Sequence, residues 1–190
     1  MSKLVWLFAI GCALCGCGSM SNRLAPEKLN PAIVSANSAI VVLSTGAAER
    51  CVSAATMLNL APAGSPYGKN GILGINVDAY VVKSDFADHQ GSLSAFEVKP
   101  GSYQLYPSTL NPYISPVKVP RAEFSVAAGE VVYIGEFFMP VACSTNGLTQ
   151  FRDQEVRDLS LLRERNPQLS AKPITKRIAV FSGYVLGTEA

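Results

Sequence analysis

The residues best suited to chemistry are one histidine and three nearby aspartates. His89 is the only histidine in the sequence, and three carboxylates precede it closely: Asp78, Asp85 and Asp88. Imidazole and carboxylate groups bind transition metals and act as general acids and bases. A transition-metal site usually needs more histidine or cysteine ligands than this stretch offers. We therefore favour a polar, solvated loop ending at Gly91 over a metal or acid–base cluster, and we expect no metal and no cofactor.

Other catalytic patterns are weaker. A Ser-His-Asp or Cys-His enzyme would have to use His89. The stretch from Gly68 to Gly71 lacks both the spacing and the Lys-Ser/Thr pair of a phosphate-binding P-loop. Paired carboxylates, as in glycoside hydrolases, are available from several glutamates that any sheet protein can carry: Glu97, Glu123, Glu130 and Glu136. We therefore predict that the protein is not an enzyme.

Tyrosines and arginines are the candidate recognition residues. Tyrosine is enriched in recognition surfaces because its ring packs while its hydroxyl stays hydrogen-bonded. We interpret five tyrosines as a candidate binding surface, against the alternative that half of them lie at core edges: Tyr67, Tyr80, Tyr103, Tyr106 and Tyr113. Four arginines near a predicted helix more simply form a solvated face than a site for an anionic partner: Arg152, Arg157, Arg163 and Arg165.

The N-terminus has the pattern of an export signal. Lys3 precedes an apolar run, Leu4 to Leu14, which is shorter than the roughly 20 residues of a membrane-spanning helix. The run fits the apolar core of a secretory signal peptide, roughly 7–15 residues. A buried N-terminal helix is the alternative, and the polar sequence that follows argues against it.

The end of this run, Leu14-Cys15-Gly16-Cys17, resembles the lipobox of bacterial lipoproteins. The resemblance implies that residues 1–16 are removed and that the Cys17 thiol carries a diacylglycerol while its new amine is acylated. Cys12 ends a second possible lipobox, but its apolar core is shorter, so we favour Cys17. Gly18 stands where members of this family retained in the inner membrane carry Asp, which implies an outer-membrane location facing the periplasm. Several acyl chains anchor a protein far more firmly than one.

Two cysteines remain in the chain after such cleavage. Export would place Cys51 and Cys143 in an oxidising compartment, where two remaining thiols usually pair. Closing a loop of roughly 90 residues stabilises by about 4–5 kcal/mol in the chain-entropy model. We expect a structural disulfide, against the alternatives of two separately buried thiols or a redox-active pair.

Composition limits the remaining classes. Apolar residues make up 48% of the 190 residues and charged residues 16%, which indicates a folded chain. A formal charge of +2 provides no field to attract nucleic acid, so we expect no nucleic-acid partner. With one long apolar run, the chain is not a multi-span membrane protein.

Strand patterns dominate the rest of the sequence. Residues 17–38 contain Pro26 and Pro31 and read as a lipid-anchored tether. From residue 39 to 190 we expect one domain whose strands include 39–44, 52–60, 72–78, 93–98, 102–106, 123–126, 131–139 and 176–186. The proline-rich stretch 111–120 reads as an edge strand or an irregular crossing.

Two turns predict hairpins, and one strand predicts two buried faces. Pro100-Gly101 is the signal for a type II turn, and Ala127–Glu130 reads as a second hairpin turn. Strand 131–139 is apolar on both faces, with Val131, Tyr133, Phe137 and Met139 expected on one face and Val132, Ile134 and Phe138 on the other. Such a strand must be covered on both sides, and we expect a second sheet on one side and a helix on the other.

One helix is predicted, over about 153–166. Asp153 is a candidate N-cap, and Glu155 suits the first turn. The apolar stripe would consist of Val156, Leu159, Leu162 and Leu161, and Pro167 would end the helix.

Together these patterns predict a mainly β protein, an antiparallel β-sandwich with one helix in its C-terminal half. Phe96–Tyr103 and Phe124–Gly135 resemble prealbumin-type or Ig-like sandwich modules of uncharacterised bacterial lipoproteins. The expected function is a lipid-anchored periplasmic module that binds or scaffolds another envelope protein. The alternatives are a hydrolase of envelope polymers and a periplasmic carrier of a small ligand.

Overall fold

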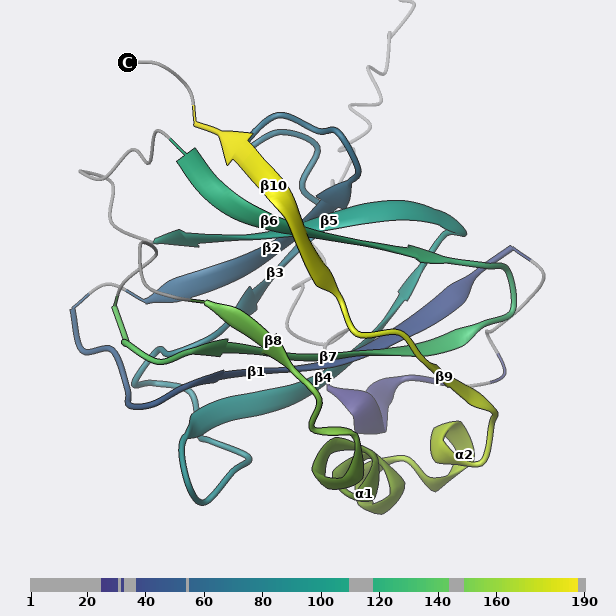
Figure 1. The fold of residues 1–190 in the computed structure, drawn as a ribbon. Helices are drawn as coiled ribbons and strands as arrows, with labels where there is room; N and C mark the ends of the chain where they lie inside the picture. Colours follow the sequence, from purple (N-terminus) through teal and green to yellow (C-terminus); the bar gives the residue numbers. More distant parts are fainter. Residues whose placement is uncertain are drawn as a thin grey trace, which may run out of the picture.

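The computed structural model describes residues 25–30, 32, 37–53, 55–109, 118–143 and 149–187. Within these residues the chain is a β-sandwich of two five-stranded sheets, with helices on one outer face (Figure 1). The predicted fold class is therefore confirmed. No helix of the described residues is both long and apolar enough to cross a bilayer.

The first sheet has the order β4-β1-β7-β8, and β9 also pairs with β7. In this sheet β1 and β9 run parallel to β7, and the other pairs are antiparallel. The strands of this sheet are β1 (Ala39–Ala47), β4 (Gln90–Val98), β7 (Val131–Met139), β8 (Gln150–Arg152) and β9 (Ile174–Lys176).

The second sheet has the order β10-β6-β5-β2-β3 and is antiparallel throughout. Its strands are β2 (Thr56–Pro62), β3 (Leu73–Asn76), β5 (Gly101–Thr109), β6 (Lys118–Val126) and β10 (Val180–Leu186). Strand β2 begins at Thr56 and not at the predicted position 52. Val52, in the segment before it, is 81% exposed.

The main core fills the space between the sheets. Buried side chains from both sheets meet there, including Val41, Leu43, Leu58, Phe96 and Leu105. A smaller cluster lies on the outer face of the first sheet, where Leu162 and Leu169 of the helices cover Ile40, Val42 and Tyr133. Strand β7 is therefore covered by a sheet on one side and by helices on the other, as the sequence predicted.

A bulge in β7 changes which side chains share a face. The pairing of β1 with β7 shifts between Val42 and Ser44, and Gly135 there has φ of +93°. Beyond the bulge, Phe137 and Met139 join the inter-sheet core. The prediction that they share a face with Val131 and Tyr133 was wrong, because an extra residue reverses the alternation of side chains.

The predicted hairpins are also wrong. Strand β4 belongs to the first sheet and β5 to the second, and the same holds for β7 and β6. The turns at Pro100 and at Ala127–Glu130 therefore carry the chain across the sandwich. Gly101 has φ of +154°, far from the roughly +80° of a type II turn. A turn signal specifies reversal of the chain, but it does not specify whether the two strands pair or stack.

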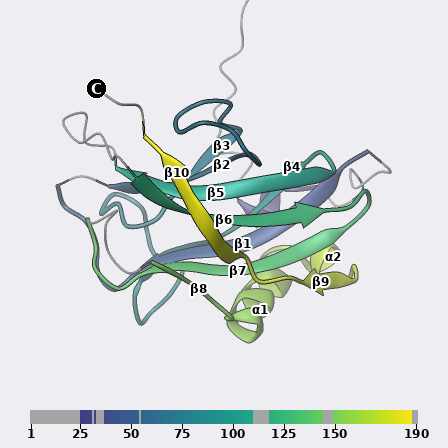
Figure 2. The same cartoon turned by 45° about the horizontal axis from the view of Figure 1, so that its top comes forward.

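The last predicted strand, 176–186, is two strands in different sheets. After β9 the chain continues along β7, where the amides of Arg177 and Ala179 donate to the carbonyls of Tyr133 and Ile134. It then enters β10, which crosses towards the second sheet (Figure 2). Within β10 the register against β6 shifts between Phe181 and Gly183, so Phe181 packs against the inter-sheet core and Val185 against a different cluster.

The stretch 111–120 falls mostly outside the described residues, but Pro120 lies in β6, an inner strand. It is tolerated because β6 pairs with β5 over residues 122–126, whereas Pro120 lies opposite Tyr184 of β10. The expected edge position was therefore wrong for this residue. Pro120 itself does not pair with β5.

The helix α1 spans Glu155–Arg165, and Gln154 occupies its N-cap position. Asp153 lies one residue earlier and accepts a hydrogen bond from the amide of Glu155. Val156 is 88% exposed, and the fully buried Asp158 and Leu162 face the sheet instead. Pro167 does not simply end a helix, because it begins the short helix α2 (Pro167–Ser170).

Residues 25–30, which the sequence predicted as part of a tether over 17–38, pack against the domain. A short 3-10 helix, η2 (Pro26–Lys28), packs against β4 and α1, and it is the purple segment beside the helices in Figure 1. Pro26 is buried, and Leu29 packs against the outer cluster of the first sheet. Residues 25–30 are therefore part of the folded body.

Candidate functional site

His89 lies in a buried polar cluster. Its Nδ1 is 2.7 Å from an Asp88 carboxylate oxygen, and its Nε2 is 2.8 Å from Oε1 of Glu136. The other two aspartates lie elsewhere, with Asp85 paired to Arg165 and Asp78 beside the disulfide. The alternative interpretation, a cluster of His89 with all three aspartates, is therefore not what the structure shows. The solvated-loop interpretation was also wrong for His89, whose side chain is only 5% exposed.

Glu136 is the centre of this cluster. It follows the bulge in β7 and is fully buried on the outer face of the first sheet. Besides His89, two arginines donate to it: Arg152 through Nε at 2.8 Å and through its terminal nitrogen, and Arg157 at 2.9 Å. Two cations and an imidazole thus surround one buried carboxylate.

Asp158 is a second buried carboxylate in the same cluster. Ser44 of β1 and Tyr133 of β7 donate their hydroxyls to it at 2.6 and 2.8 Å, and Nε of Arg157 donates at 2.9 Å. Burial raises the pKa of the Asp158 carboxyl, against the opposing effect of the Ser44 hydrogen bond and the Arg157 charge. Burial likewise raises the pKa of the Tyr133 hydroxyl well above its usual value, with the Asp158 charge next in size. Tyr133 is therefore a neutral donor to the carboxylate.

We call these seven residues the polar network: Ser44, His89, Tyr133, Glu136, Arg152, Arg157 and Asp158. Aromatic rings enclose it, because Arg157 lies over Phe86 at 3.8 Å and Arg152 over Phe138 at 3.4 Å from the ring centroids. Phe86 also stacks on His89.

Gly46 of β1 makes room for the imidazole. A Cβ at this position would lie 2.7 Å from Cδ2 of His89 and 2.9 Å from Oε1 of Glu136. A larger residue would therefore displace the ring from its carboxylate.

The polar network has little capacity for further chemistry, because its hydrogen-bonding groups already have partners within the protein. A carboxylate only accepts hydrogen bonds, so both ring nitrogens of His89 can donate at once only when the ring carries both protons. Glu136 and Asp158 already accept bonds from cations and hydroxyls of the protein. The arrangement joins α1, β8 and the His89 segment to the first sheet, and it has the character of a structural network.

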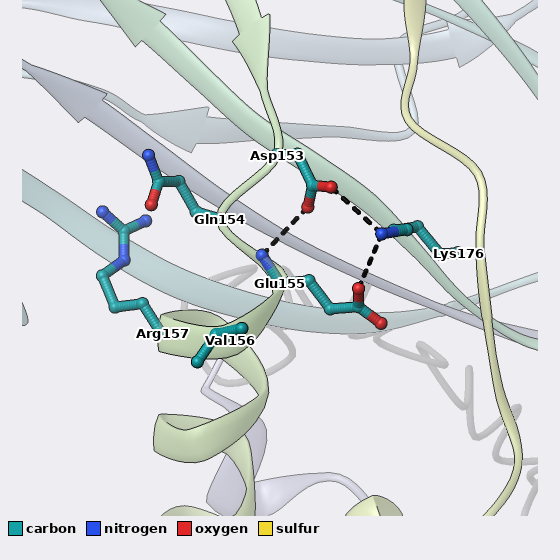
Figure 3. Close-up of a pocket in the computed structure, with 6 residues that line it drawn as sticks. All are labelled: Asp153, Gln154, Glu155, Val156, Arg157 and Lys176. Carbon is teal, nitrogen blue, oxygen red and sulfur yellow. Dashed lines mark hydrogen bonds and ion pairs between the residues drawn. The ribbon is translucent and has the colours of Figure 1, made fainter.

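The pocket in Figure 3 lies at the start of α1 and has a volume of about 360 Å³. Lys176 of β9 pairs there with Asp153 at 3.0 Å and with Glu155 at 2.8 Å. The hydrogen bond from Lys176 lowers the pKa of the Asp153 carboxyl. Arg157 extends from the opposite side of the helix start, away from Lys176. Lys176, Asp153 and Glu155 thus pair with one another, and Arg157 pairs with Glu136 and Asp158.

The disulfide predicted between Cys51 and Cys143 is confirmed. The two Cα atoms are 5.1 Å apart, and the bond closes a separation of 92 positions. Asp78 lies beside it and accepts from the amides of Thr56 at 2.6 Å and Cys143 at 2.8 Å. The sulfurs and the Asp78 carboxylate lie within 4.8 Å of one another, but disulfide sulfurs are not the thiolates that bind a metal.

The tyrosines do not form one surface. Tyr103 is buried in the inter-sheet core against Phe124. Tyr106, three positions along the same strand, lies on the opposite face, where it packs with Tyr67. Tyr80 is 58% exposed at the disulfide, and Tyr113 lies outside the described residues. The shared face predicted for the tyrosines was therefore wrong for Tyr103 and Tyr106, because β5 points them in opposite directions into packed layers.

Tyr80 instead belongs to an apolar surface beside the disulfide. Val52 and Val81 are 81% and 72% exposed, and they line a hollow of about 190 Å³ together with Tyr80 and Cys51. Val141, two positions before Cys143, is 57% exposed. We call Val52, Tyr80 and Val81 the disulfide-end patch.

The predicted arginine face is mostly paired. Arg152 and Arg157 lie in the polar network, and Arg165 donates to Asp85 at 2.9 Å, which leaves Arg163 on the exposed side. The other predicted acids are dispersed, with Glu123 paired to Arg121, Glu130 to Arg177, and Glu97 exposed.

Sequence reasoning missed the polar network as a unit. The available signal was Glu136, a charged residue in the middle of a strand that must be buried on both faces. The second signal was Asp158, which is four positions from Leu162 and so lies on the same face of α1.

Comparisons with known proteins identify no relative. No family model matches the chain, and neither a curated protein nor a solved structure gives a match. The site must therefore be interpreted from its own geometry.

Proposed function

We propose that this protein is a lipid-anchored, non-enzymatic binding module of a bacterial envelope. In this proposal Cys17 carries the acyl chains, the domain faces the periplasm from the outer membrane, and the partner is another envelope protein. The hydrolase and the small-ligand carrier are the competing interpretations.

The observation that carries the proposal is the disulfide beneath an exposed apolar patch. Stable disulfides are typical of proteins exported to an oxidising compartment, which agrees with the lipobox-like start of the chain. The bond also joins the segment of Cys51, which is followed by Val52, to the segment of Cys143, which lies two positions after Val141. An apolar patch held rigid in this way loses little conformational freedom when a protein partner covers it.

The geometry offers less support to the two competitors. A hydrolase needs a free carboxylate or base beside a substrate cleft, whereas Glu136 and Asp158 are buried and hydrogen-bonded to cations and hydroxyls. A carrier needs a cavity between the sheets, and that space holds the packed side chains of the main core.

The anchor is tested by metabolic labelling with radioactive palmitate in a bacterial host. Cys17→Ser should abolish the label, and the matched control Cys12→Ser should retain it. Label that persists in Cys17→Ser and disappears in Cys12→Ser would place the anchor at Cys12. An unlabelled wild-type protein would refute the anchor.

The binding surface is tested by photo-crosslinking in intact cells. A photoreactive side chain replacing Val81 should capture a discrete envelope protein, whereas the same group replacing the exposed Ser182 of β10 should not. Equal capture from both positions, or none from Val81, would contradict a partner at the disulfide-end patch.

A further inference from the structure

Residues 25–30 are fastened to the corner between α1 and α2. The Asn166 side-chain amide donates to the carbonyl of Pro26 at 2.7 Å and to that of Leu29 at 2.8 Å. Its oxygen accepts from the amide of Leu169 at 2.9 Å, where Asn166 caps α2. One buried side chain therefore caps a helix and holds the segment that leads back to the N-terminus. We call residues 25–30 the strap.

Docking of the strap leaves residues 18–24 between an anchor at Cys17 and the folded body. Eight residue steps separate Cys17 from Ala25, and at about 3.6 Å each they span at most about 29 Å. Had residues 18–38 all been free, the maximum reach would have been about 75 Å, which would permit every orientation of the domain.

The short reach restricts how the domain sits on the bilayer. A globular unit of this size has a radius of gyration of about 15 Å, and thus a diameter of about 40 Å. The second sheet forms the layer opposite the helices (Figure 1). Since the strap packs on the outer face of the first sheet, that layer could reach the membrane only if the chain from Cys17 were stretched close to its maximum span.

We propose that the strap sets the orientation of the domain on the membrane, so that the surface of η2, α1 and α2 faces the lipid headgroups. This inference rests on the proposed anchor at Cys17. It leaves the outer face of the second sheet directed away from the bilayer.

The exposed side chains at this corner carry both signs of charge. Glu27 and Glu164 lie among Lys28 and Arg163, and Gln168 is neutral. Alternating charges give little net attraction to an anionic bilayer. In this proposal the tether, and not charge, holds the surface of η2, α1 and α2 near the bilayer. Residues 18–190 without acyl chains should therefore not bind vesicles.

The test uses the acylated full-length protein in phosphatidylethanolamine–phosphatidylglycerol vesicles whose headgroups carry an energy-transfer acceptor. A donor is placed at exposed Gln168 of α2 or, as the matched position, at exposed Ser182 of β10. Energy transfer should be several-fold greater from Gln168. Equal transfer, or greater transfer from Ser182, would overturn the orientation.

Two variants separate the strap from other causes. A Gly-Ser linker of about ten residues between Leu24 and Ala25 adds roughly 35 Å of reach, so the difference between the donors should disappear while the fold is untouched. Asn166→Ala should reduce the difference by releasing the strap. A difference that survives the linker would show that the surface binds lipid by itself and would refute control by the tether.

The same experiment distinguishes the two proposals. If the wild-type protein carries no acyl chain and does not sediment with the vesicles, the anchor has failed. If it sediments but both donors report equal transfer, only the orientation has failed.

Discussion

At the scale of single residues, Glu136 decides how the outer face of the first sheet is built. It is a fully buried carboxylate, and Arg152, Arg157 and His89 all turn towards it. A buried ion pair contributes little net stability by its presence, but removal of one partner leaves the others unpaired. Replacing Glu136 should therefore change the free energy of unfolding more than replacing an exposed glutamate.

Glu136→Gln should destabilise the protein strongly, because it preserves volume but leaves Arg152 without its counter-charge and leaves Arg157 paired with Asp158 alone. Breaking a buried pair typically costs about 3–5 kcal/mol, and urea denaturation measures the change. Glu97→Gln is the matched control, because Glu97 is the exposed residue of β4, and its effect should stay within about 0.5 kcal/mol. Similar losses in both variants would contradict the role of the polar network.

Single residues also explain what the sequence could and could not reveal. The pairing of Cys51 with Cys143 was predictable, because the expected cleavage and acylation would leave only these two thiols, and two thiols in an oxidising compartment usually pair. The polar network was not, because its members come from β1, β7, β8, α1 and the segment of His89. Only the folded pairing of these elements brings the side chains together.

At the scale of elements, the glycine at the β7 bulge determines which face each later side chain of this fully buried strand occupies. Strand positions were predictable from alternating apolar residues, and the two-sided burial of β7 followed from its composition. The face on which each side chain lies after Gly135 was not predictable, and neither was the sheet to which each strand belongs. A bulge or a turn is a local feature, but it changes the position of everything that follows.

Gly135→Ala should destabilise more than Gly129→Ala. Both glycines have positive φ, +93° and +77°, which costs an L-residue roughly 1–2 kcal/mol. At Gly135 a Cβ would also lie 2.9 Å from the carbonyl oxygen of Arg152, whereas nothing lies within 4 Å at Gly129. Equal midpoints in urea for the two variants would contradict the bulge assignment.

The turn from β6 to β7 should carry a pH dependence. Glu130 accepts from the amide of Ala127 and pairs with Arg177, both at 2.9 Å. Burial acts to raise the pKa of Glu130, but these bonds outweigh it and the pKa is lowered. A lowered folded-state pKa gives stability that is present above the unfolded pKa and is lost as pH falls through the folded one.

The stability difference between wild type and Glu130→Gln should therefore shrink below about pH 4.3, the ordinary value for glutamate. Thermal unfolding at a series of pH values measures it. Parallel curves for the two proteins down to strongly acidic pH would refute the linkage.

At the scale of the whole molecule, three features act together in our account: the anchor, the strap and the disulfide. The strap places the helices towards the bilayer, and the disulfide fixes the apolar patch at an end of the sandwich. The fold class was predictable from many short strands and one helix. The inclusion of residues 25–30 in the folded body was not predictable, because their fastening depends on Asn166 far along the chain.

Replacing both Cys51 and Cys143 by alanine should cost about 4–5 kcal/mol, since the bond closes a separation of 92 positions. Chemical denaturation under non-reducing conditions measures the loss. Crosslinking from the disulfide-end patch should fall in the same variant, and an unchanged stability would contradict the structural role of the bond.

The most direct test of the account is mass spectrometry of the native protein purified from a bacterial envelope without reductant. We predict an N-terminal peptide that begins at acylated Cys17, together with a single cross-linked peptide pair containing Cys51 and Cys143. A chain that begins at Met1 without fatty acid and carries two free thiols would contradict it.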